Sequence, residues 1–288
     1  MEFAKYHALG NDYLVVESGA LAEPLTPAQA RRLCDRHLGL GADGILLREP
    51  GPAHRVRILN PDGSEAEKSG NGLRIFARYL FDRGVVASDA FEVETLGGAV
   101  TCRVLDGGST VCVDMGTVSF DSAAIPVAGP PREVLREPIH VGGLDLEFSA
   151  ASVGNPHCVV LREAVSAEEA QRLGPLLERD PRFPRRTNVQ LVQVLGPARL
   201  RVEVWERGAG YTLASGSSAC AAAAVTHRLG LTGASVVVEM PGGSLEVEIS
   251  PDFRARLTGG VTKVAEGRLD PEAWGRPARG RAWRRLRR

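Results

Sequence analysis

Two serine-glycine motifs contain residue types that could bind an anion together. Ser69 opens the motif Ser-Gly-Asn-Gly and Ser215 opens Ser-Gly-Ser-Ser, and a largely apolar segment typical of a helix follows each. The first turn of a helix leaves backbone N–H groups unpaired, and its partial positive charge attracts anions. Glycine lets the ligand approach closely. Taken singly, either motif is equally well explained as a helix cap. Together they predict a carboxylate site made by the backbone amides at the two helix starts.

Other polar side chains stand in loops or in otherwise apolar segments. An arginine can bind a second carboxylate through two parallel hydrogen bonds, and asparagine amides suit the polar groups around it. Any one asparagine is commonly a turn residue, and a lone histidine is usually structural. As a set they suit a small substrate with ammonium and carboxylate groups at both ends. The set comprises Asn11, Asn60, Asn155, His157, Asn188, Glu206 and Arg207.

A diverged internal repeat relates the two motifs. Asn155 follows Asn11 by 144 residues, each after a glycine and before an apolar strand, and Ser215 follows Ser69 by 146. Similar halves predict two lobes related by a pseudo-twofold axis, with the site in the cleft between them. We assign residues 1–116 plus 260–269 to the N-terminal lobe and 117–259 to the C-terminal lobe. Residues 270–288 form an arginine-rich tail that we expect to be partly disordered.

The elements that must position these residues alternate between short β-branched runs and longer helical segments. Thr26 followed by Pro27 marks a helix start. Helices are predicted over 26–36, 70–83, 167–178 and 217–229. Strands are predicted over 13–17, 55–59, 90–95, 111–115, 157–161, 200–205, 236–240 and 245–249, with a last strand, 261–265, returning to the first lobe.

Composition excludes several classes of function. The 35 basic residues equal the 35 acidic ones, so no net charge attracts nucleic acid or an anionic membrane. We see no secretion signal and no membrane-spanning run, which predicts a cytoplasmic protein. The five cysteines are widely spaced without a Cys-x-x-Cys pair, which predicts buried, reduced thiols and no metal site.

At these residues the sequence resembles the diaminopimelate epimerase family, over about residues 1–269. The resemblance implies an α/β (α+β) fold of two pseudosymmetric lobes, each a mixed barrel-like sheet around a central helix, and no cofactor. The matching motifs are Lys-Tyr-His-Ala-Leu-Gly-Asn-Asp-Tyr (5–13), Asp-Arg-His (35–37), Gly-Ala-Asp-Gly (41–44), Asn-Pro-Asp-Gly-Ser-Glu (60–65), Gly-Asn-Gly (70–72), Gly-Asn-Pro-His (154–157), Glu-Arg-Gly-Ala-Gly (206–210) and Pro-Gly-Gly (241–243).

The resemblance also implies a reaction and its residues. Family members invert an amino-acid α-carbon with two bases, one on each face, and LL-diaminopimelate becomes the meso form on the route to lysine and peptidoglycan. The proton-transfer residues would be Ser69 and Ser215, with His157 and Glu206 as tuning partners. The non-reacting end of the substrate would be bound by Asn11, Asn60, Asn155, Asn188 and Arg207. The reacting carboxylate would be held by the amides of Gly70, Asn71, Gly216 and Ser217. The resemblance also suggests a homodimer.

Serine stands at both positions where the resemblance implies a catalytic cysteine. A thiol ionises near pKa ~8.5, and a serine hydroxyl far above that range, so the exchange weakens proton transfer. Tyr211 and Ser218 depart from the pattern on the same loop, which favours natural divergence. Three functions follow: a serine-based epimerase, an isomerase or dehydratase of a related amino acid with one competent base, or a catalytically silent protein that binds the amino acid.

Overall fold

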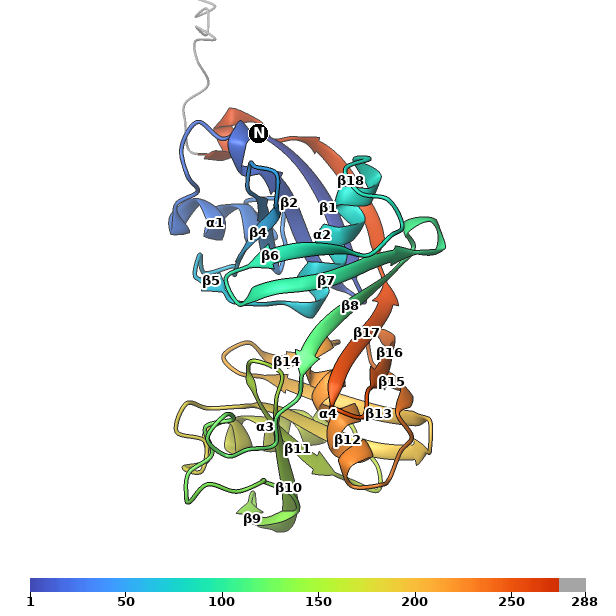
Figure 1. Cartoon of the computed structure of the whole chain (residues 1–288). Coiled ribbons are helices and arrows are strands. Elements are labelled where there is room, and N and C mark those ends of the chain that lie inside the picture. The colour runs from blue at the N-terminus through green and yellow to red at the C-terminus, as the bar shows by residue number, and fades with distance from the viewer. Residues whose placement is uncertain (275–288) are drawn as a thin grey trace, which may run out of the picture.

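The computed structural model describes residues 1–274 and shows two lobes joined by a pair of long strands (Figure 1). The joining strands are β8 (Thr110–Thr117) and β17 (Arg254–Gly260), which pair antiparallel. After β17, strand β18 (Thr262–Arg268) runs antiparallel to β1 (Glu2–Ala8). The last strand therefore returns to lie beside β1.

The first half of the chain forms a mixed sheet around one helix. β1 pairs antiparallel with β2, β2 parallel with β3, β3 antiparallel with β4, and β4 parallel with β6, after which β6, β7 and β8 follow one another antiparallel. Its remaining elements are β2 (Asn11–Glu17), η1 (Ser18–Ala20), α1 (Pro27–Cys34), β3 (Gly44–Arg48), β4 (His54–Leu59), β5 (Glu65–Ala66), α2 (Gly70–Asp82), β6 (Phe91–Thr95), β7 (Gly98–Leu105) and η2 (Asp106–Gly108).

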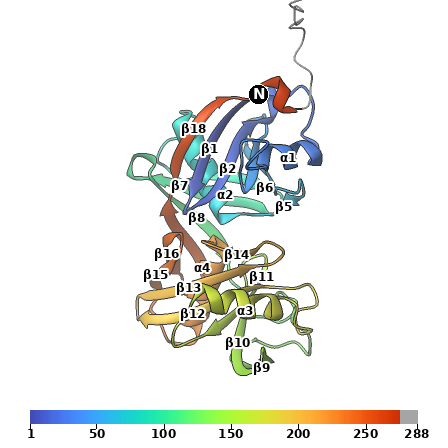
Figure 2. The ribbon, with the colours of Figure 1, turned by 180° about the vertical axis from the view of Figure 1, so that it is seen from behind.

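The second half repeats that order of pairings with the same directions. β10 pairs antiparallel with β11, β11 parallel with β12, β12 antiparallel with β13, and β13 parallel with β15, followed by antiparallel β16 and β17. The reverse view shows α3 lying across β12 and β13 (Figure 2). The elements are β9 (Glu137–Val141), β10 (Leu144–Ser152), β11 (Pro156–Leu161), α3 (Ala167–Glu178), β12 (Asn188–Gly196), β13 (Arg199–Glu206), β14 (Gly210–Thr212), α4 (Gly216–Arg228), β15 (Ser235–Met240), β16 (Gly243–Ile249) and η3 (Pro271–Trp274).

Two helices form the centres of the lobes. α2 and α4 are buried over most of their length, and one hydrophobic core surrounds both. α2 is amphipathic with large apolar residues, whereas α4 carries a run of fully buried alanines from Ala221 to Ala224. The predicted α/β fold with a sheet around each central helix is therefore observed.

The first predicted helix is shorter than expected. It ends at Cys34 rather than at residue 36, because Asp35 adopts an extended backbone (φ −62°, ψ 125°). The Asp35 carboxylate then accepts hydrogen bonds from the backbone N–H groups of His37 (2.8 Å) and Leu38 (2.6 Å), which turns the chain. Its N-terminus is as predicted, with Thr26 as N-cap.

Residues 1–274 include the start of the predicted tail, all of the α-helices described above and all five cysteines. Of the predicted tail, Pro271–Trp274 form η3, and residues 275–288 lie outside the described part. Within residues 1–274 no helix combines the length and apolar character needed to cross a bilayer, and no cluster of metal-ligating side chains occurs there. All five cysteines are free thiols, and all but Cys112 are buried.

Candidate active site

The two serine-glycine motifs meet where the lobes join. Ser69 and Ser215 are the N-caps of α2 and α4, with nearly the same backbone conformation (φ −142°, ψ 116° and φ −144°, ψ 123°). A Cβ atom built on Gly70 would lie 3.4 Å from the Cα atom of Gly216, and a Cβ atom built on Gly216 would lie 3.4 Å from the Cα atom of Gly70. Two helix N-termini thus face each other at a glycine contact, an arrangement suited to one shared anion.

The two serines have different partners. Ser69 Oγ accepts a hydrogen bond from the Gly72 N–H at 3.0 Å and lies 3.2 Å from the Tyr13 hydroxyl. Ser215 is buried and makes no such cap bond, and its hydroxyl lies near the Glu206 carboxyl group. Burial raises the pKa of Glu206, and the Ser215 hydroxyl opposes that rise in part. Glu206 is therefore a carboxyl with increased proton affinity beside the second serine.

A buried network crosses the junction between the lobes. Asn71 Nδ2 donates to Asn11 Oδ1 (3.1 Å) and to the Ala214 carbonyl (3.4 Å), which belongs to the opposite half. Arg74 is fully buried and donates to Asn71 Oδ1 at 2.7 Å and to the Gly70 carbonyl at 3.3 Å. Burial lowers the pKa of Arg74 to about 10. This network holds the N-terminus of α2 against the segment that leads into α4.

Ion pairs fix the loop that carries Asn11. Asp12 pairs with Lys5 (2.9 Å) and with Arg36 (2.8 Å), and Arg36 also pairs with Asp43 (2.7 Å). Asp43 in turn accepts from Asn11 Nδ2 at 2.9 Å. Three of the motifs that carried the family resemblance, at 5–13, 35–37 and 41–44, are thus one connected structure that orients Asn11.

His157 is placed inside the second lobe. Its side chain is fully buried, and burial is the main cause that lowers its pKa to about 3. One ring nitrogen, Nε2, lies 3.0 Å from Asn155 Oδ1, and Asn155 Nδ2 lies 3.4 Å from Ser217 Oγ at the start of α4. In the described structure, His157 therefore reaches the second motif through Asn155, as a neutral ring.

The remaining predicted binding residues are engaged with nearby backbone or with their own loop. Asn188 donates to the Pro156 carbonyl (2.9 Å) and accepts from the Arg207 N–H (2.9 Å). The exposed Arg207 guanidinium donates to the Arg185 carbonyl at 3.3 Å. Asn60 Nδ2 donates to Ser64 Oγ at 2.9 Å. These bonds order the loops beside the two motifs, and a substrate contact by these side chains stays a prediction.

Three residues of the site were missed from the sequence. Tyr13, Asp43 and Arg74 all lie in or next to quoted motifs, yet none was assigned a role. The available signal was the repeat itself, because Tyr13 follows Asn11 by two residues as His157 follows Asn155. Arg74 gave a second signal, a charged residue within an otherwise apolar stretch of helix.

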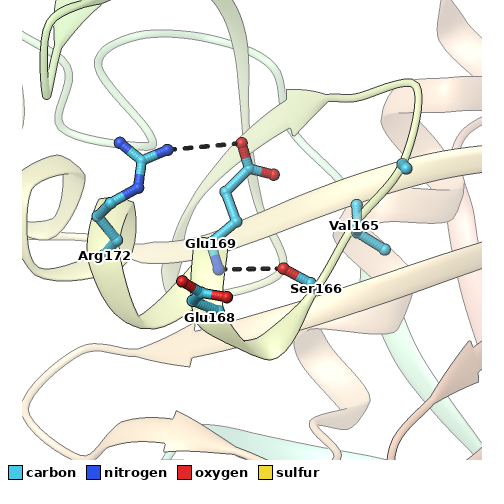
Figure 3. Close-up of a pocket in the computed structure, with 6 residues that line it drawn as sticks. Val165, Ser166, Glu168, Glu169 and Arg172 are labelled. Carbon is cyan, nitrogen blue, oxygen red and sulfur yellow. Dashed lines mark hydrogen bonds and ion pairs between the residues drawn. The ribbon is translucent and has the colours of Figure 1, made fainter.

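A hollow elsewhere does not compete as the substrate site. It measures about 290 Å³ and lies at the N-terminus of α3, lined by Ser166, Glu168, Glu169 and Arg172 among others (Figure 3). Ser166 Oγ already accepts from the Glu169 N–H at 3.2 Å, and two glutamates occupy the first turn. Their charge disfavours a carboxylate there.

Comparison with solved structures shows the fold. A predicted epimerase from Pseudomonas aeruginosa superposes with a TM-score of 0.68 at 19% identity, covering 93% of this chain and 98% of that one. A hydroxyproline epimerase from Agrobacterium vitis, with bound trans-4-hydroxy-L-proline, has a TM-score of 0.69 at 16% identity, covering 96% and 94%.

Comparison with known sequences shows the family. A protein from Nostoc sp. called diaminopimelate epimerase 2 is 52% identical over 278 residues, covering 94% of this chain and 96% of that protein. The diaminopimelate epimerase of Pelotomaculum thermopropionicum is 43% identical over 276 residues, covering 93% and 98%. The family model described as Diaminopimelate epimerase matches residues 3–120 and 149–264, which include both serine motifs. With its paired lobes and facing helix N-termini, this chain belongs to the diaminopimelate epimerase family.

Proposed function

We propose that this protein inverts the α-carbon of an amino acid without a cofactor, and that its substrate is LL-diaminopimelate, which becomes the meso form. The observation that carries the proposal is the meeting of two helix N-termini, each with a serine as N-cap. Family membership supports the choice of reaction and substrate.

The geometry supports binding of the reacting carboxylate by the helix termini. Backbone amides of both α2 and α4 would donate to the carboxylate, and its charge increases as the α-proton leaves. Fixed donors and aligned helix dipoles stabilise that developing charge without reorganising. An α-carbon held at this point would have one serine on each face.

Proton transfer by a serine needs a partner that accepts or supplies the proton. Glu206 would be such a partner, because it lies near Ser215 and burial increases its proton affinity above that of an ordinary glutamate, which favours a general base. In one step the α-proton would pass to Ser215 Oγ while the serine hydroxyl proton passes to Glu206. The remaining predictions, a cytoplasmic homodimer with the lobe boundaries at residues 116 and 260, belong to this proposal and rest on the sequence.

The experiment is α-proton exchange in deuterium oxide. The purified protein is incubated with LL-diaminopimelate, deuterium at the α-carbon is followed by NMR, and the meso product is measured by chiral separation. We expect exchange accompanied by inversion, and its loss in Ser215→Ala. The matched control is Ser166→Ala, which removes the N-cap serine of α3 away from the site. Protein that binds the ligand yet shows neither exchange nor product would refute the proposal and favour a binding role.

A second candidate, a reaction that needs one base, is favoured by the unequal serines. Ser215 lies near the Glu206 carboxyl group, whereas Ser69 is bonded to Gly72 and Tyr13. An isomerase or dehydratase of a related amino acid would exchange the proton on one face only. Deuterium incorporation with complete retention of configuration would therefore support this candidate over epimerisation.

A further inference from the structure

A tyrosine hydroxyl contacts the first serine from within the same lobe. Tyr13 lies on β2, is only 7% exposed, and places its Oη atom 3.2 Å from Ser69 Oγ. Its ring packs against the backbone of Gly44 on β3, so closely that a Cβ atom there would lie 2.5 Å from Tyr13 Cε1. The ring is therefore confined, and its hydroxyl is held beside the serine.

The hydrogen-bond capacity of Ser69 leaves room for Tyr13 as a donor. A serine oxygen accepts two hydrogen bonds and donates one. Ser69 Oγ already accepts from the Gly72 N–H at 3.0 Å. When the Tyr13 hydroxyl donates to the same oxygen, both acceptor positions are filled, and the proton of Ser69 is left for a ligand.

We propose that Tyr13 is a positioning residue that supplies the proton of Ser69 and takes it back. The pair of Tyr13 and Ser69 would serve one face of the α-carbon, as Glu206 and Ser215 serve the other. This inference rests on the proposed epimerisation.

The protons balance over one inversion. The α-carbon loses its proton to Ser215 Oγ, whose hydroxyl proton moves to the Glu206 carboxylate. On the opposite face the α-carbon gains the hydroxyl proton of Ser69, and Ser69 Oγ receives the proton of Tyr13. Glu206 ends protonated and Tyr13 ends as phenolate, so the total charge of the protein is unchanged. After product release a proton returns from Glu206 to Tyr13 through solvent.

The electrostatics of the site couple the two ends of this relay. Burial raises the pKa of Tyr13 to about 12, the bond to Ser69 lowers it, and the negative charge of Glu206 raises it. Once Glu206 has taken a proton that negative charge is gone, and the phenolate becomes easier to form. A phenol, with an ordinary pKa of about 10, also releases a proton far more readily than an aliphatic hydroxyl.

The test removes only the hydroxyl. In Tyr13→Phe the ring and its packing on Gly44 are kept, and we expect the rate of inversion to fall by at least ~10²-fold with the KM for LL-diaminopimelate nearly unchanged. The matched control is Tyr6→Phe: Tyr6 is equally buried, and its hydroxyl donates to Asp82 at 2.8 Å. We expect the control to change the rate by no more than ~2-fold.

The same substitution in a cysteine variant distinguishes a role of Tyr13 in proton supply from a role in packing. In S69C/S215C the thiols ionise near neutral pH and carry their own protons, so adding Y13F should cost less than ~3-fold. An equal loss in the serine and cysteine backgrounds would show a structural role and overturn the inference. So would a full rate in Y13F alone. If the parent protein itself fails to invert the substrate, the proposed function is refuted and this inference with it.

Discussion

The contact between the two helix N-termini can be tested by adding one methyl group. In Gly216→Ala the new Cβ atom would lie 2.7 Å from Leu257 Cδ2, a side chain that is fully buried. Carbon atoms pack at about 3.5–4.0 Å, so the helix or the leucine must move by roughly 0.8–1.3 Å. We expect α4 to yield in part, because Leu257 is enclosed by core.

The expected loss follows from that displacement. A misplacement of about 1 Å at a reacting centre costs roughly 10²-fold in rate, which is about 2.7 kcal/mol of transition-state stabilisation. Overpacking should lower the free energy of unfolding by about 1 kcal/mol, since alanine favours the helix and offsets part of the strain. The assay is kcat/KM for inversion, with thermal unfolding measured alongside.

Gly70, the counterpart of Gly216 in the repeat, provides a matched control, and a second substitution at Leu257 should restore the rate. In Gly70→Ala the nearest atoms to the new Cβ lie at 3.4 Å, an ordinary contact, so the rate should change by less than ~3-fold. In G216A/L257V the colliding methyl is removed, and most of the rate should return. Equal losses in G70A and G216A, or no recovery in the double variant, would refute the argument from helix spacing.

Three further predictions address the site. Changing both Ser69 and Ser215 to cysteine should raise the rate of inversion by ~10²-fold or more, measured by exchange, because a thiol is the better proton carrier. Glu206 must be ionised to act as a base, and burial raises its pKa. As pH decreases, activity should therefore begin to fall at a pH above the usual pKa range of glutamate. Glu206→Gln should abolish this acid limb of the pH–rate profile. Asp12→Asn should lower the free energy of unfolding at pH 7 by about 2 kcal/mol in urea denaturation. Burial alone would raise the pKa of Asp12, but its bonds to Arg36 and Lys5 lower it. The stabilisation is therefore complete above about pH 4 and is lost as pH falls through the lowered value, where variant and parent should converge.

The sequence predicted the four α-helices and nine of the eighteen strands of residues 1–274, because the patterns of these elements are local; it missed β1, β3, β5, β7, β9, β10, β12, β14 and β17. Apolar alternation located the nine predicted strands within a few residues, and the helix over 167–178 has the predicted limits. The helix over 26–36 ended early for a reason that propensity does not contain, the turn that the Asp35 carboxylate makes with the two residues that follow. Limits of this kind depend on one side chain rather than on periodicity.

The sequence predicted the backbone segments of the candidate site better than the hydrogen-bond partners of its side chains. Glycine motifs and a repeat predict where two helix N-termini lie, because both depend on short segments. The bond between Tyr13 and Ser69 joins residues 56 positions apart, and the bond between Asn71 and Ala214 spans 143. Contacts of this range are set by how β2, α2 and the second lobe pack, and one sequence does not contain that packing explicitly.

The repeat also explains why the two serines differ. Tyr13 on β2 and His157 on β11 occupy equivalent places, each paired with the parallel strand beside it, at Gly44 and Asn188. Gly44 leaves room for a ring that reaches the serine of its own lobe, whereas His157 is bonded to Asn155.

The two lobes also differ in the residue that stands at the end of the equivalent strands β4 and β13. Asn60, at the end of β4, is bonded to Ser64 in its own loop, while Glu206, at the end of β13, lies near Ser215. In the proposed site the lobes therefore share one anion cradle and carry different proton partners. Inversion that uses Glu206 as the base starts from an ionised carboxyl and a protonated phenol, whereas the reverse inversion starts from a protonated carboxyl and a phenolate. Burial raises the pKa of Tyr13 to about 12, so the phenolate is the scarcer starting state at neutral pH, and kcat should be larger in the direction that uses Glu206 as the base.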